Sequence, residues 1–350
     1  MITDLPTSDD LNGSARALLN MAWETALGVF RLLERTQVET WDDDGSVREE
    51  YHASRQPALR HALVMVHQAQ ELGLKARVAA VSPYLLLVGE PRLWPSGADR
   101  RPTSFEEFRT LDAADLVRVH NTVCDTPLDA NFTRLFEEGR RARNKIVHLG
   151  GHRIVSDARD ILILILDTHA ALFPEVRWAA ARMDHELNDG YAIAGGADVE
   201  TGLLNDFELL QKVVAPRYIR QHFGFDKRRR AFMCLSCSSD QLDWEAGSRF
   251  AQLLDGREDQ LFCAVCAVTR TVLRESCGVD GCRCDVLAED DYKWGTCLHC
   301  NQVNDAREPI RRSCPWWWCR STVAKLTGRA LPTSAVAAGQ LRGWSSEIFG

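Results

Sequence analysis

The sequence predicts a mainly helical protein that ends in a small cysteine-rich region with short β-strands. Two observations support this fold class. Apolar residues recur at three- and four-residue steps through much of the first 226 residues, as on one face of an α-helix. Eleven of the twelve cysteines lie after residue 233, where turn residues replace that periodicity. We therefore predict a helical domain over residues 1–226, a cysteine-rich domain over 227–330 and a C-terminal tail over 331–350.

The composition is that of an ordinary globular chain, with 45% hydrophobic and 26% charged residues. A net charge of -7 argues against wholesale coating of nucleic acid, so any such contact must come from a local basic patch. The first ten residues lack the basic and apolar regions of a signal peptide. The most apolar run, Ile161–Leu166, is far shorter than the roughly 20 residues of a membrane span. We expect a cytoplasmic protein with no membrane partner.

The periodicity and the capping residues predict a series of helices in chain order. We expect them at Ser14–Arg35 and Leu59–Gly73, after the capping-box sequence Ser104–Glu107, at Asp112–Val123, Asp129–His148 and Asp157–Leu172, and within residues 175–225. Pro91–Pro102 is typical of an exposed loop. A strand is the alternative for Asp157–Leu172, because its Ile residues favour strands, but the flanking residues favour a helix.

The Asp129–His148 segment ends in a cationic cluster. Three arginines, a lysine, an asparagine and a histidine fall within nine residues, just before Gly150 and Gly151: Arg140, Arg141, Arg143, Asn144, Lys145 and His148. Such a cluster in an acidic chain suits a phosphate-bearing partner. We expect that partner to be RNA, with Arg140, Arg141 and Lys145 among the residues that bind it.

Arginine and histidine together suit the cleavage of RNA. RNA carries its own nucleophile, the 2′-hydroxyl, next to the scissile phosphate. A histidine side chain suits the proton transfer because its ordinary pKa is close to neutrality. An arginine suits the phosphate because its planar guanidinium donates two parallel hydrogen bonds. This chemistry requires no metal ion.

The spacing of Arg143 and His148 is by itself a weak signal. Arg217 and His222 have the same spacing, but only Arg143 is followed by an asparagine and lies in a clear amphipathic helix. Asn144 and His148 are four residues apart and share a helix face. The alternative is a solvated helix end whose histidine caps backbone carbonyls.

The sequence Arg143-Asn144-Lys145-Ile146-Val147-His148 resembles the R-N-x-x-x-H signature of HEPN domains. The resemblance covers roughly residues 10–220 in fold type, although only these six residues carry it. It implies a helical bundle and a metal-independent ribonuclease that acts as a homodimer. Arg143 and His148 would be its catalytic pair, and Asn144 a polar helper. Many HEPN proteins are toxins or antiphage effectors, so an antitoxin or another protein partner is also implied.

The cysteine-rich region has the spacing of structural zinc sites. Cys234-x2-Cys237 and Cys263-x2-Cys266 have the form of a zinc ribbon, in which four thiolates close a tetrahedron around one ion. A second site is expected from Cys297, Cys300, Cys314 and Cys319. Cys277, Cys282 and Cys284 remain. They either displace members of the second set or bind a further ion together with His299 or an outside ligand.

Basic and aromatic residues surround these cysteines. Arg228, Arg229 and Arg230 and the run Trp316–Trp318 suit single-stranded RNA, since arginines pair with phosphates and bases stack on aromatic rings. In the alternative interpretation the tryptophans fill a small ribbon core and the arginines are solvated. Zinc ribbons also dock proteins, so a protein partner stays open.

Taken together, these features favour a two-domain endoribonuclease of HEPN type. A helical domain would cut RNA as a homodimer, and a region with structural Zn²⁺ would recognise the substrate or a partner. The rival hypothesis is a non-catalytic adaptor with a helical dimerisation domain and zinc ribbons that bind nucleic acid or protein. A nucleotide-transfer or nucleotide-binding role lacks a glycine-rich phosphate loop or paired aspartates to support it.

Overall fold

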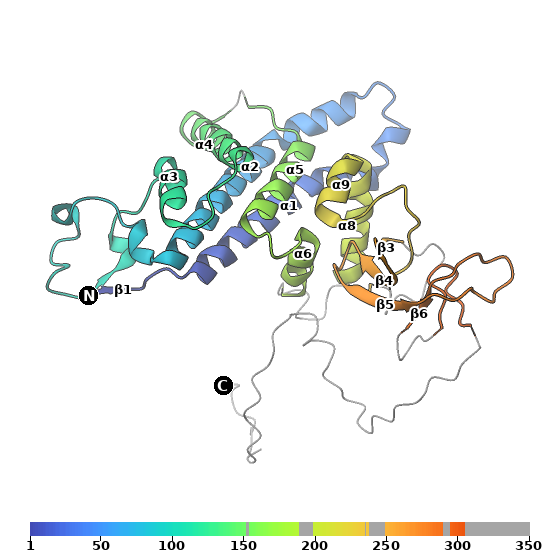
Figure 1. Ribbon diagram of the computed structural model, residues 1–350. Helices are drawn as coiled ribbons and strands as arrows, with labels where there is room; N and C mark the ends of the chain where they lie inside the picture. Colours follow the sequence, from blue (N-terminus) through green and yellow to red (C-terminus); the bar gives the residue numbers. More distant parts are fainter. Residues whose placement is uncertain (152–153, 189–198, 235, 238–248, 290–294, 305–350) are drawn as a thin grey trace, which may run out of the picture. The chain divides into compact units, whose positions relative to one another are not determined.

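The computed structural model describes residues 1–304, except 152–153, 189–198, 235, 238–248 and 290–294. Met1–Asn304 forms one compact unit, which is mainly helical with a small sheet in its cysteine-rich part, as predicted (Figure 1). Its helices are α1 (Ser8–Thr36), α2 (Ser46–Val81), α3 (Ala113–Val123), α4 (Ala130–Leu149), α5 (Ala158–Leu172), α6 (Trp178–Leu187), α8 (Val199–Val213) and α9 (Pro216–Phe223). The predicted domain limit at 226 falls between α9 and the sheet, and the predicted tail lies outside the described residues.

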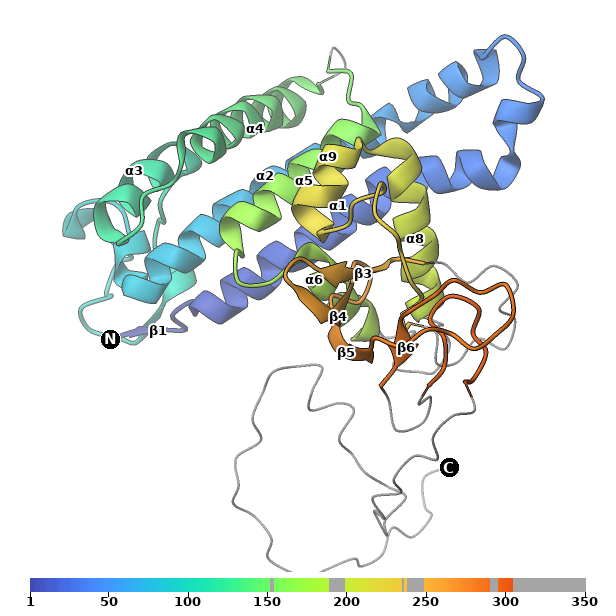
Figure 2. The ribbon, with the colours of Figure 1, turned by 45° about the vertical axis from the view of Figure 1, so that its right-hand side comes forward.

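Helices α1 and α2 form the long scaffold of the unit and pack side by side (Figure 2). The apolar stripes predicted for them are buried; they include Leu19, Ala22, Ala26 and Val29 on α1, and Leu59, Ala62, Val66 and Ala69 on α2. Both helices begin earlier than predicted, and α2 ends at Val81 and not near Gly73. Thr7 caps α1 by accepting a hydrogen bond from the backbone N–H of Asp10, and α2 continues through Pro57.

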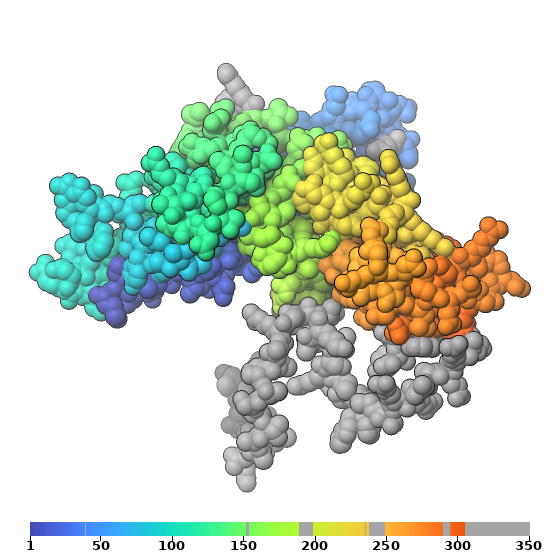
Figure 3. Space-filling view, viewed as in Figure 1, coloured from blue at the N-terminus to red at the C-terminus, as the bar shows by residue number. Residues whose placement is uncertain are grey.

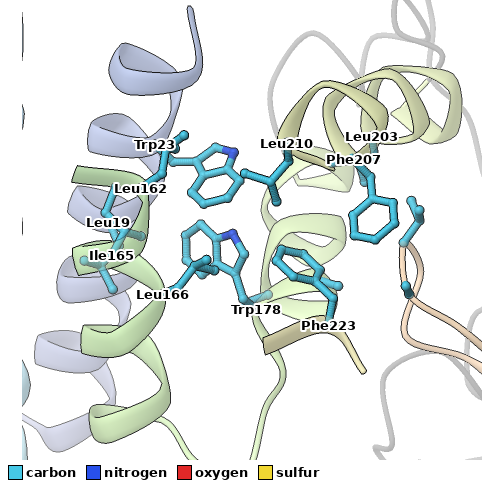
Figure 4. Close-up of a cluster of buried hydrophobic side chains, with 14 of the residues drawn as sticks. Leu19, Trp23, Leu162, Ile165, Leu166, Trp178, Leu203, Phe207, Leu210 and Phe223 are labelled. Carbon is cyan, nitrogen blue, oxygen red and sulfur yellow. The ribbon is translucent and has the colours of Figure 1, made fainter. Parts of the chain in front are cut away.

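Helix α5 carries the Ile/Leu run, and the expectation of helix over strand is confirmed. The Asp157 carboxylate caps it by accepting a hydrogen bond from the backbone N–H of Arg159 at 2.7 Å. Figure 4 shows Leu162, Ile165 and Leu166 facing the side chains of α1, in a cluster that also takes in aromatic residues of α6, α8 and α9. Among the described residues, no helix has both the length and the apolar character needed to cross a membrane.

The connection between α2 and α3 contains little regular structure, and the predicted exposed loop Pro91–Pro102 lies within it. It includes 3₁₀ turns at Pro83–Leu86, Pro91–Leu93 and Phe105–Glu107, with a further turn at Val38–Thr40 between α1 and α2. Where a helix was expected after Ser104, only the single 3₁₀ turn forms, and the Ser104 side chain makes no cap hydrogen bond. Strands β1 (Ile2–Thr3) and β2 (Thr103–Ser104) pair in parallel beside it.

The cysteine-rich part is an antiparallel sheet of four short strands, in the order β3 (Ala251–Leu254), β4 (Arg257–Cys263), β5 (Thr269–Leu273) and β6 (Leu287–Ala288). It packs on the helices through aromatic rings. The Phe207 ring on α8 lies 5.0 Å from the Phe250 ring, and the Arg177 guanidinium lies 4.8 Å above the Phe262 ring. In the space-filling view the sheet lies against α8 and α9 (Figure 3).

A buried histidine lies inside the helical core. His169 on α5 is only 2% exposed, and its ring lies 5.3 Å from Phe173 and 5.1 Å from Trp178. Within the described part its Nε2 has no hydrogen-bond partner. Burial, together with the charges of Arg16 and His222, lowers the pKa of His169 from 6.5 to about 4. The imidazole is therefore neutral in the folded chain at neutral pH.

We predict that His169 makes the fold sensitive to acid. Because its pKa is lower in the folded chain, the unfolded chain binds the proton first as the pH falls below 6.5. The free energy of unfolding should fall between pH 6.5 and about 4, by up to ~3 kcal/mol from this residue, and should not depend on it above pH 6.5. Urea unfolding at a series of pH values measures this dependence.

His169→Phe should flatten the decline, whereas a matched change at an exposed histidine of α2, His61→Phe, should leave it as in the wild type. Equal pH dependence in the wild type and in His169→Phe would show that the acid sensitivity has another source.

Candidate nucleic-acid interface and metal centres

Helix α4 begins and ends where its capping residues predict. The Asp129 carboxylate accepts a hydrogen bond from the backbone N–H of Phe132 at 2.8 Å. At the other end, Gly150 adopts a left-handed conformation with φ of 70°, which glycine enters without strain, and its N–H donates to the Lys145 carbonyl. The cationic cluster therefore occupies the last turns of a well-capped helix.

One stripe of α4 faces the core, and Arg143 falls on it. Phe132, Phe136 and Ile146 are buried, and Gly139 packs against α2. These positions follow steps of three, four and seven residues, and Arg143 lies between Gly139 and Ile146 in the same series. The Arg143 side chain is half-buried as a result. The Arg143 side chain therefore extends from α4 at the edge of the interface with the core, and not from the fully solvated face of the helix.

The structure brings Arg143 and Asn144 together and leaves His148 exposed. Nη1 of Arg143 donates a hydrogen bond to Oδ1 of Asn144 at 3.1 Å. His148 lies in the last turn of α4, one turn beyond Asn144 on the same face. Within the described residues, no hydrogen bond joins its imidazole to either side chain. All three predicted residues thus lie at one helix end, with the imidazole accessible to a large substrate.

The three predicted RNA-binding residues of α4 differ in their contacts. Arg140 pairs with Glu137 at 2.8 Å, so part of its charge is neutralised. Arg141 and Lys145 are exposed, and neither has an ion-pair partner in the part of the chain that the structure describes. Arg141 and Lys145 are therefore the cations of the cluster with charge to offer a phosphate.

Two of the three predicted RNA-binding arginines in the cysteine-rich part are held by the fold. Arg229 contacts the Asp255 carboxylate and donates to the Leu253 carbonyl. Arg230 donates to the Arg283 carbonyl and lies over the Phe232 ring. Arg228 is exposed. Trp316–Trp318, predicted to stack on bases, lie outside the described residues.

The second arginine–histidine pair with the same spacing has a structural role. His222 on α9 is buried, and its Nε2 lies 3.0 Å from the Asp167 carboxylate of α5. The guanidinium of Arg217 lies 4.7 Å above the Tyr218 ring. By contrast, His148 is exposed and Arg143 is hydrogen-bonded to the adjacent Asn144, so neither side chain is buried in the core. This difference supports the choice of Arg143 and His148 as the candidate site.

Four cysteines of the ribbon form a buried cluster. Cys234 and Cys237 precede β3, and Cys263 and Cys266 lie at the turn between β4 and β5. All four are buried, and their Sγ atoms lie within 4.8 Å of one another. The backbone N–H of Val265 points at Cys263 Sγ, 3.4 Å away. The predicted members of the first site are thus brought together.

A second four-cysteine cluster forms, with a different membership from the one predicted. Cys297 and Cys300 are joined by Cys277 and Cys282 from the loop between β5 and β6. The other predicted members, Cys314 and Cys319, lie outside the described residues. The signal was present in the sequence, because Cys277 and Cys282 have the same four-residue gap as the predicted pair. Cys284 is buried nearby, and its Sγ faces the Val286 carbonyl.

The sulfur–sulfur distances fit a tetrahedral metal ion. They are 3.7 Å for Cys234–Cys266, 3.8 Å for Cys237–Cys263, 3.7 Å for Cys277–Cys300 and 3.8 Å for Cys282–Cys297. An ion with metal–sulfur bonds of about 2.3 Å at the centre of a tetrahedron requires edges of about 3.8 Å. A disulfide, with a sulfur–sulfur bond of about 2.05 Å, does not fit. Both clusters therefore have the composition and geometry to hold a metal.

A cavity of about 540 Å³ lies away from both the α4 cluster and the cysteines. It lies between α1, α6 and α8, and several of the residues that line it form ion pairs. Arg31 binds Asp206 at 2.5 Å and Glu24 at 2.6 Å, and the buried Arg182 binds Glu24 at 2.5 Å. Burial opposes ionisation of Glu24, but hydrogen bonds from the two arginines lower its pKa below its ordinary value. Since these charges neutralise one another, we interpret them as a network that holds the three helices together.

We predict that the second metal ion is bound by Cys277, Cys282, Cys297 and Cys300, as the structure groups them. Purified chain should carry two equivalents of bound metal. Cys277→Ser should lose one equivalent, because four thiolates are needed to close each tetrahedron. The variants Cys284→Ser and Cys314→Ser should keep both equivalents of metal. Elemental analysis of each variant provides the measurement.

The opposite pattern, with metal lost in Cys314→Ser and retained in Cys277→Ser, would restore the ligand set expected from the sequence. Cys284→Ser is the matched control, since it removes a buried thiol of the same loop outside the four-sulfur group.

Comparison with known protein families, with curated proteins and with solved structures finds no match for this chain. Its function must therefore be argued from its own residues: a cationic helix end with an exposed histidine, and two four-cysteine clusters.

Proposed function

We propose that the chain is a metal-independent endoribonuclease of HEPN type, whose cysteine clusters hold structural zinc. The observation that carries this proposal is the end of α4. There the half-buried Arg143 is hydrogen-bonded to Asn144, and the exposed His148 lies one turn further on. Arg141 and Lys145 are exposed beside them, with no ion-pair partner among the residues that the structure describes. A toxin or antiphage role belongs to the same proposal.

Each residue of the helix end has one task in this reaction. His148 takes the proton from the 2′-hydroxyl, which then attacks the adjacent phosphorus and expels the 5′-oxygen of the next nucleotide. Arg143 holds the phosphate oxygens through its guanidinium, and Asn144 fixes the orientation of that guanidinium through their hydrogen bond. Arg141 and Lys145 bind neighbouring phosphates. The products are a 2′,3′-cyclic phosphate, or its opened form, and a 5′-hydroxyl.

Zinc is the metal that best suits the two cysteine clusters. Four thiolates from short cysteine pairs are its usual structural ligands, and such a site has no open position for a substrate. When bound, zinc would cross-link a sheet too small to supply much apolar core, and such sites contribute on the order of 10 kcal/mol of apparent binding energy. We assign the clusters to folding and to substrate or partner recognition, and not to the chemical step.

Exposed apolar side chains near His148 support assembly of two copies at this end. Val147 is 53% exposed and Leu149 is 72% exposed, and the two flank His148 in the last turn of α4. Apolar groups beside a charged site are typical of a surface that another protein covers. A homodimer would bring two such helix ends to one cleft and shield the reacting phosphate from water.

We predict that cleavage will depend on His148 and Arg143 and not on a free divalent metal. His148→Ala should slow cleavage of RNA by about 10²- to 10⁴-fold, the usual contribution of a general acid–base group. Arg143→Ala should weaken it as well, because the phosphate loses its bidentate partner. The assay measures cleavage of a labelled RNA in the presence of EDTA, which removes free divalent metal. The incubation is kept short enough to leave structural zinc in place.

The matched control is His185→Ala, which removes a histidine from another helix, α6, and should leave the rate unchanged. Undiminished cleavage by a folded His148→Ala variant would end the proposal. RNA binding without cleavage by the wild type under any condition, together with indifference to Arg143→Ala, would favour the non-catalytic adaptor.

A further inference from the structure

The second cysteine cluster is more open to solvent than the first, and it is built on loops. All four cysteines of the first cluster are buried, whereas Cys282 and Cys300 of the second are partly exposed. Cys277 and Cys282 come from the loop between β5 and β6, and Cys297 and Cys300 from the segment that follows β6. The positions of these four thiolates therefore depend on contacts between the two segments, because none of them lies on a strand of the sheet.

The Asn304 side chain joins these two segments. Its Nδ2 lies 3.7 Å from Cys277 Sγ and donates a hydrogen bond to the Gly295 carbonyl at 3.1 Å. Its Oδ1 accepts a hydrogen bond from the backbone N–H of Gly278. A side-chain amide offers two N–H donors and one carbonyl acceptor, so it makes all of these contacts at once. One side chain thus contacts a cysteine of the cluster, the residue after that cysteine and the turn that leads into Cys297.

Asn304 occupies a close-fitting position. Its backbone N–H also donates to the Gly295 carbonyl at 3.1 Å, and the backbone N–H of Cys297 donates to the Gln302 carbonyl at 3.0 Å. A Cβ atom added at Gly278 would lie 3.3 Å from Asn304 Oδ1, and one added at Gly295 would lie 3.2 Å from the Asn304 carbonyl oxygen. The two glycines therefore let Asn304 approach the backbone of both segments.

We infer that Asn304 is the positioning residue of the second metal site: its amide ties Cys277 to the turn that carries Cys297, and it donates a hydrogen bond to the Cys277 thiolate. This inference rests on the metal-binding part of the proposed function and not on the cleavage of RNA. Four thiolates around a divalent ion leave an excess of negative charge, which an N–H donor stabilises. In the first cluster a backbone group, the N–H of Val265, approaches Cys263 Sγ in the same way.

The test measures the affinity of each metal site in the full-length protein. Asn304→Asp keeps the shape of the side chain and the acceptor for Gly278, and it replaces the N–H donors by a carboxylate oxygen. We expect the affinity for one of the two zinc ions to fall by about 10- to 100-fold in competition with a chromophoric chelator, and the affinity for the other to stay unchanged.

Two further measurements assign the effect to the second site. In the Cys277→Ser background, which should lack that ion, Asn304→Asp should leave the affinity for the remaining ion unchanged. With Co²⁺ in place of Zn²⁺, Asn304→Asp should shift the sulfur-to-metal charge-transfer bands of one ion and not of the other. A residue that only stabilised the fold would not shift these bands.

Gln302→Glu is the matched control, because it makes the same change from amide to carboxylate on an exposed side chain of the same turn, and it should bind both ions as the wild type does. Unchanged affinity in Asn304→Asp would overturn the inference, as would an equal loss from both sites or the same loss in Gln302→Glu. If Asn304→Asp does not fold, Asn304→Ala removes the donors without adding charge and takes its place. A wild type that binds fewer than two ions overturns the assignment of metal to both clusters, whereas a wild type with two ions and an unaffected Asn304→Asp variant overturns this inference alone.

Discussion

The packing of α4 on α2 is the contact on which the candidate site depends. Phe132 and Phe136 anchor the first half of α4 in the core, and Gly139 lets the two helices approach at His67. The helical repeat then places Arg143 at the edge of that interface and His148 on the accessible side of the last turn. One arginine of the cationic cluster is thereby partly withdrawn from solvent, while the histidine stays within reach of a large substrate.

The cysteine-rich part is tied to the helices by packing as well as stabilised by its own clusters. Phe207 of α8 contacts both Phe225 and Phe250, and Arg177 covers Phe262 on β4. Loss of metal from the clusters would therefore also weaken the packing of α8 and α9 through these rings. The arrangement gives the sheet a role in stabilising the helical part, besides any part in recognition.

Local signals in the sequence predicted most of the helices. The bounds that they did not predict depend on tertiary packing. Asp129 and Gly150 mark the ends of α4 because capping is a local interaction. The start of α2 was predicted too late because the apolar stripe begins only at Leu59, whereas the helix already begins at Ser46 and continues through Pro57.

The site was predicted only where its residues are neighbours in the chain. The cationic end of α4 was identified from one short segment, whereas the close approach of Gly139 to His67 and Gln70 joins two helices that are far apart in the sequence. The spacing of the cysteines also left several choices for the metal ligands that join Cys297 and Cys300. In the structure, the loop between β5 and β6 brings Cys277 and Cys282 to them.

In the proposed reaction, the end of α4 cuts RNA through the substrate's own 2′-hydroxyl. Its most direct test is an RNA of defined cleavage site in which only the nucleotide before the cut carries a 2′-deoxy sugar. We expect this substitution to block cleavage there, while the unmodified RNA yields a 2′,3′-cyclic phosphate or its opened form, identified by mass spectrometry of the fragments. Cleavage that continues at the deoxy position would contradict it.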